Sequence, residues 1–279
     1  MTCREIDETK KRAERSVPVK QLSNVHIPKD VAPARGAFDP GRTPTKRNPW
    51  VIQALLILLS LTAGSTDTIG FLDLNGLFTA HVTGNLVVLA ARLVQGGDAQ
   101  LAKILAVPVF IVVLDMTILL ADGCRAAGLA PIGPLLLLQF LLLVAFLMLC
   151  AISGPHVDAD ATSAVMAAMF GVSAMAVQNA LVQISLKGAP STAVMTTNIT
   201  RFATDIGELV LGGSPADMAK ASKRASRTLV VIAGFVVGCA MGAACEAALG
   251  FWSLALPACL AFIAFGIRFA VPSDAEVVS

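Results

Sequence analysis

Thr79-Ala80-His81-Val82-Thr83-Gly84-Asn85 is one of two related heptapeptides in this chain, and the other is Thr192-Ala193-Val194-Met195-Thr196-Thr197-Asn198. The two copies share the pattern Thr-Ala-x-x-Thr-x-Asn, and each lies inside an apolar stretch that is too polar to be an ordinary membrane span. Polar side chains at membrane depth are costly and are usually functional. Paired interruptions in two halves of a chain are typical of a transporter's binding site.

The composition around the two motifs is that of an integral membrane protein. Of the 279 residues, 56% are hydrophobic and only 14% are charged, which argues against a soluble domain. Several apolar runs approach the ~20 residues that a helix needs to cross a bilayer core of ~30 Å. The alternation of apolar and polar residues that marks a membrane β-strand is missing. We therefore expect an all-α, polytopic transmembrane bundle with two polar motif helices and six clear spans, at residues 51–71, 101–121, 134–153, 161–186, 228–249 and 251–271.

The first 49 residues differ from the rest of the chain, because they mix Lys and Arg with Asp and Glu and contain no long apolar run. They are predicted to form a disordered basic tail. Lys46 and Arg47 stand just before the first span, which favours a cytoplasmic N-terminus. No apolar segment of signal-peptide type is recognised. We expect a transmembrane domain over 50–272, followed by a short C-terminal tail, 273–279.

The similarity between the two motifs extends in both directions along the chain. Upstream, the span before the first motif carries Gly64-Ser65-Thr66-Asp67, and the span before the second carries Gln178-Asn179. Downstream, Lys103 and Arg227 each precede a further apolar span. We therefore expect two related halves, about 50–154 and 161–272, each ordered as helix, polar motif segment, helix, helix.

The number of membrane crossings determines how the two halves are related. Three crossings per half would invert the second half, whereas four would keep it parallel. If the motif segments do not cross the membrane, Arg125 and Lys187 are cytoplasmic, whereas Arg92 and Lys103 are cytoplasmic if they do cross. The enrichment of basic residues in cytoplasmic loops therefore does not decide between the two arrangements. The loop around His156 lies outside the cell in the first arrangement and inside in the second.

The asparagine of each motif is the better candidate for a ligand contact. The two threonines lie four residues apart, so in a helix they share one face and bond back to a carbonyl of the preceding turn. An amide offers donors and acceptors that a helix does not consume. Asn85 and Asn198 are therefore expected to contact a solute or a facing helix.

A charged stripe extends beyond each motif. One helical face of the second segment carries, at offsets zero, three, seven and ten, Asn198, Arg201, Asp205 and Glu208. The corresponding stripe of the first segment carries His81, Asn85 and Arg92. We expect Arg92 to face Asp205, or Arg201 to pair with Asp205 along its own helix.

The polar residues admit two interpretations. For the threonines we favour helix packing, since Ser, Thr and Asn commonly hold membrane helices together. For the ionisable and amide groups we favour function, because such groups at membrane depth are expensive. The predicted substrate-binding or coupling residues are Asp67, Asn85, Gln178, Asn179, Asn198, Arg201 and Asp205. The predicted supporting residues are His81, Thr83, Arg92, Thr196 and Glu208. Asp115 and Glu246 are further isolated carboxylates that could pair with an Arg or carry a proton.

No enzyme signature is recognisable, since the chain lacks His-Glu-x-x-His, Gly-x-Ser-x-Gly, a Walker loop and a dinucleotide fingerprint. The six cysteines are scattered, with no Cys-x-x-Cys and no His at metal-ligand spacing. We expect no catalytic residue, metal or cofactor, while an unusual intramembrane enzyme stays an open alternative. Topology explains the basic tail, so no nucleic-acid partner is expected.

The motifs resemble those of the YoaK-like family of bacterial multi-pass membrane proteins, a domain of unknown function. The resemblance rests on four patterns: Gly64-x-x-Asp67-x-x-Gly70-Phe71, Phe78-x-x-x-x-Thr83-Gly84-Asn85, Gln178-Asn179 and Met195-Thr196-Thr197-Asn198. It covers about residues 50–272 and implies about six spans in the bacterial inner membrane. The family brings no assigned substrate or reaction.

Small-solute transport is the leading hypothesis. Asn85 and Asn198 would hydrogen-bond a small polar or charged solute, Asp67 or Asp205 would carry a coupling proton, and rocking of the halves would alternate access. The alternative is a non-transporting membrane sensor, scaffold or assembly factor whose polar residues only set helix packing. The expected partner is the lipid bilayer, and the sequence indicates neither the solute nor an oligomeric state.

Overall fold

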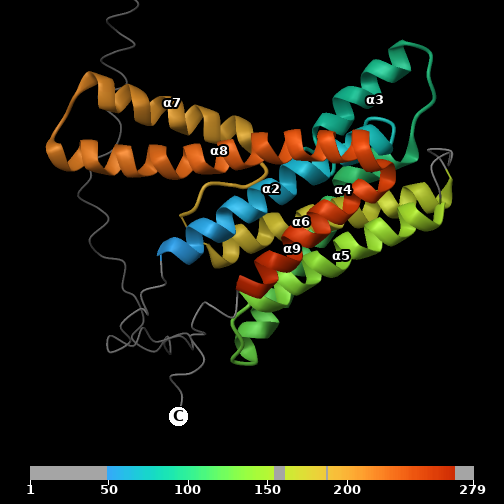
Figure 1. The fold of residues 1–279 in the computed structure, drawn as a ribbon, viewed down its shortest axis with the longest axis horizontal. Coiled ribbons are helices and arrows are strands. Elements are labelled where there is room, and N and C mark those ends of the chain that lie inside the picture. Colours follow the sequence, from blue (N-terminus) through green and yellow to red (C-terminus); the bar gives the residue numbers. More distant parts are fainter. Residues whose placement is uncertain (1–48, 154–160, 187, 268–279) are drawn as a thin grey trace, which may run out of the picture. The chain divides into compact units, whose positions relative to one another are not determined.

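The computed structural model describes residues 49–153, 161–186 and 188–267. Most of the predicted N-terminal tail, the predicted C-terminal tail and the loop around His156 lie outside this part of the chain. The described segments fold into helices without any strand, which confirms the all-α prediction (Figure 1). The helices are α2 (Pro49–Asp73), α3 (Gly84–Val94), α4 (Leu101–Ala126), α5 (Ile132–Ser153), α6 (Thr162–Ser185), α7 (Met195–Leu211), α8 (Pro215–Leu249), the 3-10 helix η2 (Gly250–Leu254) and α9 (Ala255–Ile267).

Within the described part of the chain, five stretches of helix are long and apolar enough to cross a membrane. They are Trp50–Asp73, Leu101–Ala126, Ile132–Ser153, Thr162–Ser185 and Pro215–Ile267. The last stretch contains α8, η2 and α9, and its chain turns at Gly250, whose φ of +56° favours glycine. A multi-helix membrane protein therefore follows from the length and composition of the helices.

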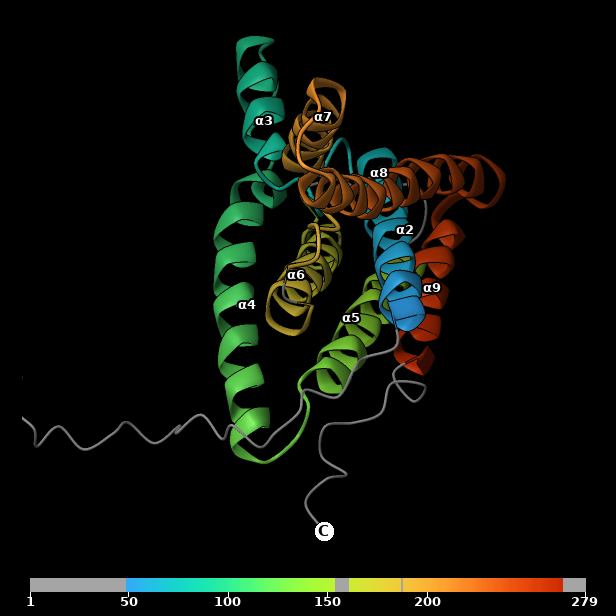
Figure 2. The ribbon, with the colours of Figure 1, turned by 90° about the vertical axis from the view of Figure 1, so that its left-hand side faces the viewer.

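The most buried of these helices are α2 and α6. Within the apolar stretches, 67% of α2 and 78% of α6 are buried, against 17% of α4. α2 packs against α8 and α9, whereas α6 packs against α4 and α5, as Figure 2 also shows. In addition, α3 contacts α4, α7 contacts α8, and α5 contacts α9. The same set of contacts results when α2 is exchanged with α6, α3 with α7, α4 with α8 and α5 with α9.

Glycine allows the close approach of α2 and α8. A Cβ atom on Gly238 would lie 2.5 Å from the carbonyl oxygen of Leu61, and one on Gly242 would lie 2.9 Å from the Cα of Ser65. Gly64 of α2 meets the backbone of α8 at Phe235 in the same way. Small residues four apart commonly let membrane helices pack backbone to backbone.

The two motif segments are only partly helical. α3 begins at Gly84 and α7 at Met195, so the first residues of each heptapeptide have an irregular backbone. The prediction that the paired threonines stack on one helical face is therefore wrong. The physical reason is that side chains bind the backbone N–H groups that a helix would use. In the first motif this side chain is Asp67, which is distant in sequence, and in the second it is the neighbouring Ser191.

Each motif segment returns to the end of the bundle from which it leaves. Asn75, just after α2, accepts hydrogen bonds at its carbonyl oxygen from Lys103 Nζ (2.7 Å) and from Arg92 (2.9 Å). Lys103 lies in the first turn of α4, so the end of α2 and the start of α4 are neighbours. In the second half, the end of α6 and the first half of α8 line one pocket. Neither motif segment separates its flanking helices onto opposite ends.

Candidate functional site

Asp67 anchors the irregular part of the first motif. Its side chain projects from α2 and is almost completely buried. Oδ1 accepts hydrogen bonds from the backbone N–H groups of Thr79 and Ala80, both at 2.8 Å. Oδ2 lies 2.6 Å from Nδ1 of His81. A carboxylate that accepts several bonds in this way stabilises the unwound backbone.

Two glycines make room for this loop between α2 and α6, the two most buried helices. A Cβ atom on Gly70 of α2 or on Gly171 of α6 would lie 3.0 Å from Cγ2 of Thr79. Thr79 is itself fully buried. The first motif therefore reaches inward to contact both α2 and α6.

His81 borders a pocket of about 520 Å³ that also exposes Asp67, Phe78 and Phe235. Its ring lies edge-on to Phe235, with 5.4 Å between the ring centroids. The hydrogen bond to Asp67 raises the pKa of His81 above 6.5, although partial burial opposes this shift. The pair offers a place where a proton can be held next to a cavity.

A neutral network holds the second motif. Gln178 of α6 donates from Nε2 to the hydroxyl of Thr192 at 2.9 Å and to the carbonyl of Leu59 in α2 at 2.8 Å. Gln139 of α5 donates to Oε1 of Gln178 at 2.7 Å. Both glutamines and Thr192 are buried. Thr192 occupies the motif position of Thr79, so a polar residue of a buried helix, α2 or α6, binds the threonine segment of each motif.

The two motif asparagines have equivalent contacts. Asn85 donates to the carbonyl of Phe78 and accepts from its N–H, both at 2.8 Å. Asn198 donates to the carbonyl of Ser191 at 2.6 Å. Each contact reaches seven residues back, and each closes the irregular loop onto the helix that follows. Oδ1 of Asn198 is buried and has no hydrogen-bond partner among the described residues.

Other predicted site residues make local contacts or face outward. Asn179 bonds the carbonyl of Met175 within α6, at 2.9 Å. Thr83 is exposed at the start of α3 and lines the pocket beside His81. Thr196 is exposed, and its carbonyl accepts a bond from Thr200 at 3.0 Å.

The predicted ion pairs of Asp205 are wrong. Asp205 pairs with Arg224 of α8, at 2.7 Å, rather than with Arg92 or Arg201. The same guanidinium contacts Glu208 at 2.7 Å. α7 folds back along the first half of α8 (Figure 1), which brings this face against α8. Arg92 lies at the end of α3 and bonds Asn75, while Arg201 is exposed.

The sequence interpretation gave no site role to Gln139, Arg224 or the buried Lys103. Gln139 had a readable signal, because it is an isolated amide in the apolar run of α5. Lys103 is fully buried and also bonds Gln100. The two isolated carboxylates differ, since Glu246 accepts a bond from Ser253 at 2.5 Å, whereas Asp115 is exposed halfway along α4.

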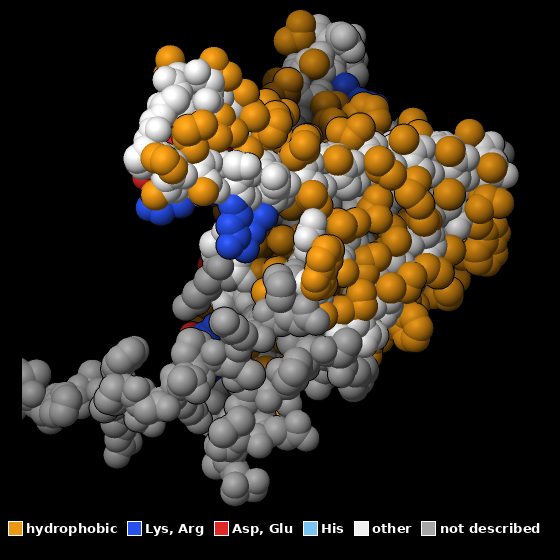
Figure 3. Space-filling view, turned by 60° about the vertical axis from the view of Figure 1, so that its left-hand side comes forward, with side chains coloured by type: hydrophobic (Ala, Val, Ile, Leu, Met, Phe, Trp, Pro, Cys, Tyr) orange, Lys and Arg blue, Asp and Glu red, His pale blue; other side chains and the backbone are white. Residues whose placement is uncertain are grey.

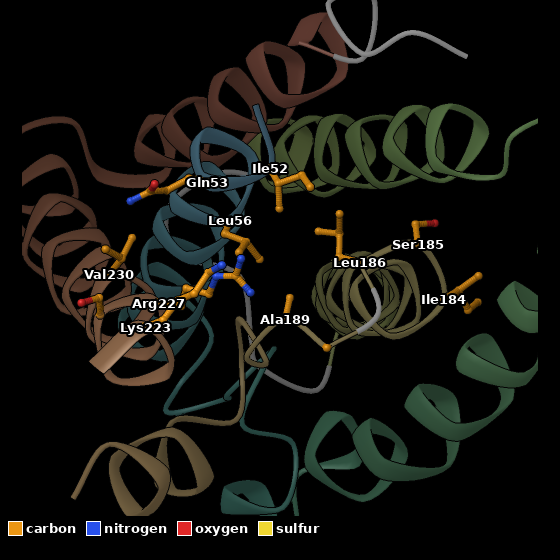
Figure 4. Close-up of a pocket in the computed structure, with 12 residues that line it drawn as sticks. Ile52, Gln53, Leu56, Ile184, Ser185, Leu186, Ala189, Lys223, Arg227 and Val230 are labelled. Atoms are coloured by element: carbon orange, nitrogen blue, oxygen red, sulfur yellow. The ribbon is translucent and has the colours of Figure 1, made fainter. Parts of the chain in front are cut away.

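A larger pocket, of about 880 Å³, opens between α2, α6 and α8 (Figure 4). Its apolar wall includes Leu56, Leu186 and Val230, and its basic side chains are Lys223 and Arg227. Figure 4 shows Arg227 directed from α8 toward Leu56. Lysine and arginine side chains also gather near the α7–α8 end in the space-filling view, beside a largely hydrophobic surface (Figure 3).

Comparison with known proteins identifies a family. The model of the family described as "Protein of unknown function (DUF1275)" matches residues 55–267. The chain therefore belongs to the DUF1275 family, in agreement with the YoaK-like resemblance of its motifs. No curated protein and no solved structure matches the chain.

Proposed function

We propose that this member of the DUF1275 family is a small-solute transporter of the bacterial inner membrane. The observation that carries the proposal is the pair of unwound polar segments held between α2 and α6. One binds α2 at Asp67, and the other is linked to α2 at Leu59 through Gln178. These positions are eight residues apart, which is about 12 Å along a helix. Transporters commonly place such interrupted segments around a site near the bilayer midplane.

In this proposal the two halves form an inverted repeat with three crossings each. α2, α4 and α5 form the first half, and α6, α8 and α9 form the second. Two observations support it: each motif segment returns to the end it leaves, and the main helix contacts survive exchange of the halves. The end with Lys220, Lys223 and Arg227 lies in the cytoplasm, because basic residues are retained there.

The two anchored loops act as gates in this mechanism. The Asp67–Thr79 contacts close the outer side, and the Gln178–Thr192 contacts close the cytoplasmic side. Release of one loop while the other stays bound would alternate access to the space between α2 and α6. The Asp67–His81 pair carries the coupling proton, because its two groups share a hydrogen bond beside the outer pocket. No catalytic step is part of this proposal.

The test measures proton movement driven by solutes. The full-length protein is reconstituted in vesicles loaded with a pH-sensitive dye, and panels of amino acids, short carboxylates, sugars and nucleobases are added outside. We expect at least one class to change the internal pH. The response should disappear in Asp67→Asn and persist in Asp122→Asn, whose exposed carboxylate lies near the end of α4. Solute uptake that ignores the proton gradient and survives Asp67→Asn would contradict the coupling.

One observation favours the alternative of a non-transporting module. Asn85 uses both ends of its amide on the backbone of its own segment, as packing alone would require. This alternative predicts that Asn85→Ala lowers stability and that no solute in the panels is transported by the wild-type protein. Uptake by the wild type that exceeds uptake by protein-free vesicles would eliminate it.

A further inference from the structure

The pocket shown in Figure 4 combines an apolar interior with unopposed positive charge. Ile52 and Leu56 of α2, Leu186 after α6 and Val230 of α8 supply hydrophobic surface. Its volume of about 880 Å³ falls in the range of small-molecule sites. No Asp or Glu belongs to the residues that line it within the described chain.

The basic side chains of the pocket differ from their neighbour on α8. Lys223 and Arg227 are four residues apart, so they lie on one face of the helix. Arg224, between them in sequence, points to α7 and is neutralised by Asp205 and Glu208. Neither Lys223 nor Arg227 has an ion pair with any residue that the structure describes. Two positive charges are therefore left for the pocket.

The positive surface continues toward α7. A smaller cavity, of about 380 Å³, shares Arg227 and Gly188 with the pocket and is also lined by Arg201. Its one acidic lining residue among those described, Asp205, is already paired with Arg224. Arg227 thus borders both spaces, and Arg201 adds a third positive charge beside them.

The pocket also lies next to the Gln178–Thr192 contact, which closes the cytoplasmic side in the proposed function. Leu56 is one turn before Leu59 on α2, and the carbonyl of Leu59 accepts the bond from Gln178. Leu186, at the C-cap of α6, lies about two turns beyond Gln178. A ligand in the pocket would therefore sit directly on the cytoplasmic side of the Gln178–Thr192 contact.

We infer that this pocket binds an amphiphilic anion, a carboxylate or phosphate attached to an aliphatic body. Lys223 and Arg227 would hold the anionic group, since charge-assisted hydrogen bonds to such groups are strong. The apolar residues of α2, α6 and α8 would cover the aliphatic part. The further statement that this anion is the transported solute rests on the proposed function. The binding of the anion to the pocket does not depend on transport.

Basic residues at a cytoplasmic helix end also serve as topology signals, and a topology signal needs only contact with water. Arg227 is exposed, but its side chain is also directed toward Leu56 and lines the pocket, so it contacts more than water (Figure 4). Binding therefore has to be tested with probes that separate the sign of the charge from the apolar part.

The probes are hexanoate, hexyl phosphate, hexanol and hexylammonium, added to the full-length protein in phosphatidylcholine nanodiscs. A ligand that binds only the folded state raises its unfolding temperature. We expect the two anions to raise this temperature and hexanol and hexylammonium to leave it unchanged. Arg227→Gln and Lys223→Gln should each weaken hexanoate binding roughly tenfold, the effect of one lost bond to a charged group.

Matched variants control for the loss of a charge and for misfolding. Arg125→Gln and Lys220→Gln remove exposed basic groups that do not line the pocket and should bind hexanoate as the wild type does. Arg227→Lys keeps the charge and should retain most of the binding. Equal responses to hexanol and hexanoate, or unchanged binding in both Gln variants, would overturn the inference.

A second lipid composition identifies the source of the anion. If phosphatidylglycerol in the nanodiscs raises the unfolding temperature and abolishes the hexanoate response, the occupant is a lipid headgroup. If the hexanoate response persists there, the pocket takes a free solute. Binding without any solute flux would contradict the proposed transport but not the anion site, whereas flux without hexanoate binding would contradict only the site.

Discussion

At the scale of single residues, the contact between Asp67 and His81 makes the first motif sensitive to pH. The hydrogen bond raises the pKa of His81 in the folded protein above its ordinary value of 6.5. A raised pKa means that protonated His81 stabilises the fold fully below pH 6.5 and that this stabilisation is lost as the pH rises through the folded-state pKa. We therefore expect the contribution of His81 to the unfolding free energy to fall as the pH rises from 6.5 through the pKa of His81 in the folded protein.

Thermal unfolding measured above and below pH 6.5 checks this expectation. Asp67→Asn should reduce the change of the unfolding temperature with pH, because a neutral amide gives protonated His81 no charged partner. His81→Gln should reduce it in the same way, because it removes the titrating group. If the unfolding temperature changes with pH as much in both variants as in the wild type, another group titrates.

The two motif asparagines should differ in their contribution to stability. Asn85 makes two hydrogen bonds with Phe78, whereas Asn198 makes one with Ser191 through its amide nitrogen. Asn85→Ala leaves a backbone donor and an acceptor unpaired, at roughly 1–3 kcal/mol for each buried group. We expect its cost in unfolding free energy to be about twice that of Asn198→Ala. Denaturant unfolding of the two variants measures the difference, and a larger cost for Asn198→Ala would refute the assignment.

At the scale of helices, the α2–α8 contact depends on the missing Cβ of Gly238. Alanine there would place a Cβ 2.5 Å from the carbonyl oxygen of Leu61, so the two helices must move apart. We expect a loss of about 1–3 kcal/mol, as for other overpacked sites. Gly123→Ala in α4 is the matched control, because no atom lies within 4 Å of its added Cβ. This control should gain roughly 0.5–1 kcal/mol, and equal effects in thermal unfolding would contradict the packing argument.

The helices were predictable to the extent that their signals are local. The apolar runs identify the long helices because ~20 apolar residues suffice to mark a span. The unwound start of the first motif was not predictable from its own residues, since Asp67, twelve residues before Thr79, binds its backbone. The Asp205–Arg224 pair depends on α7 folding back along α8, which no local pattern specifies. Gln139, as an isolated amide in an apolar run, could have been recognised as a site residue.

At the scale of the whole transmembrane unit, the arrangement of its helices requires two polar segments that enter from opposite ends. The irregular part of the first lies near the end of α2 and the start of α4, as the bond from Lys103 to Asn75 shows. The irregular part of the second lies near the end of α6 and the first half of α8. In the proposed transporter we therefore expect six crossings, with the α3–α4 loop outside the cell and the α4–α5 loop in the cytoplasm. With eight crossings, these two loops would exchange sides.

Cysteine accessibility in intact cells separates the two topologies. In a background without the six native cysteines, Asp98→Cys in the α3–α4 loop should react with an impermeant thiol reagent. Ala127→Cys, just after α4, should react only after permeabilisation, because basic residues such as Arg125 in the last turn of α4 are retained inside. Both positions are exposed. Gly213→Cys is the control, since we expect it in the cytoplasm with either number of crossings. The opposite pattern at Asp98 and Ala127 would mean that the motif segments cross, which would make the two halves parallel and remove the structural basis for gates on opposite sides.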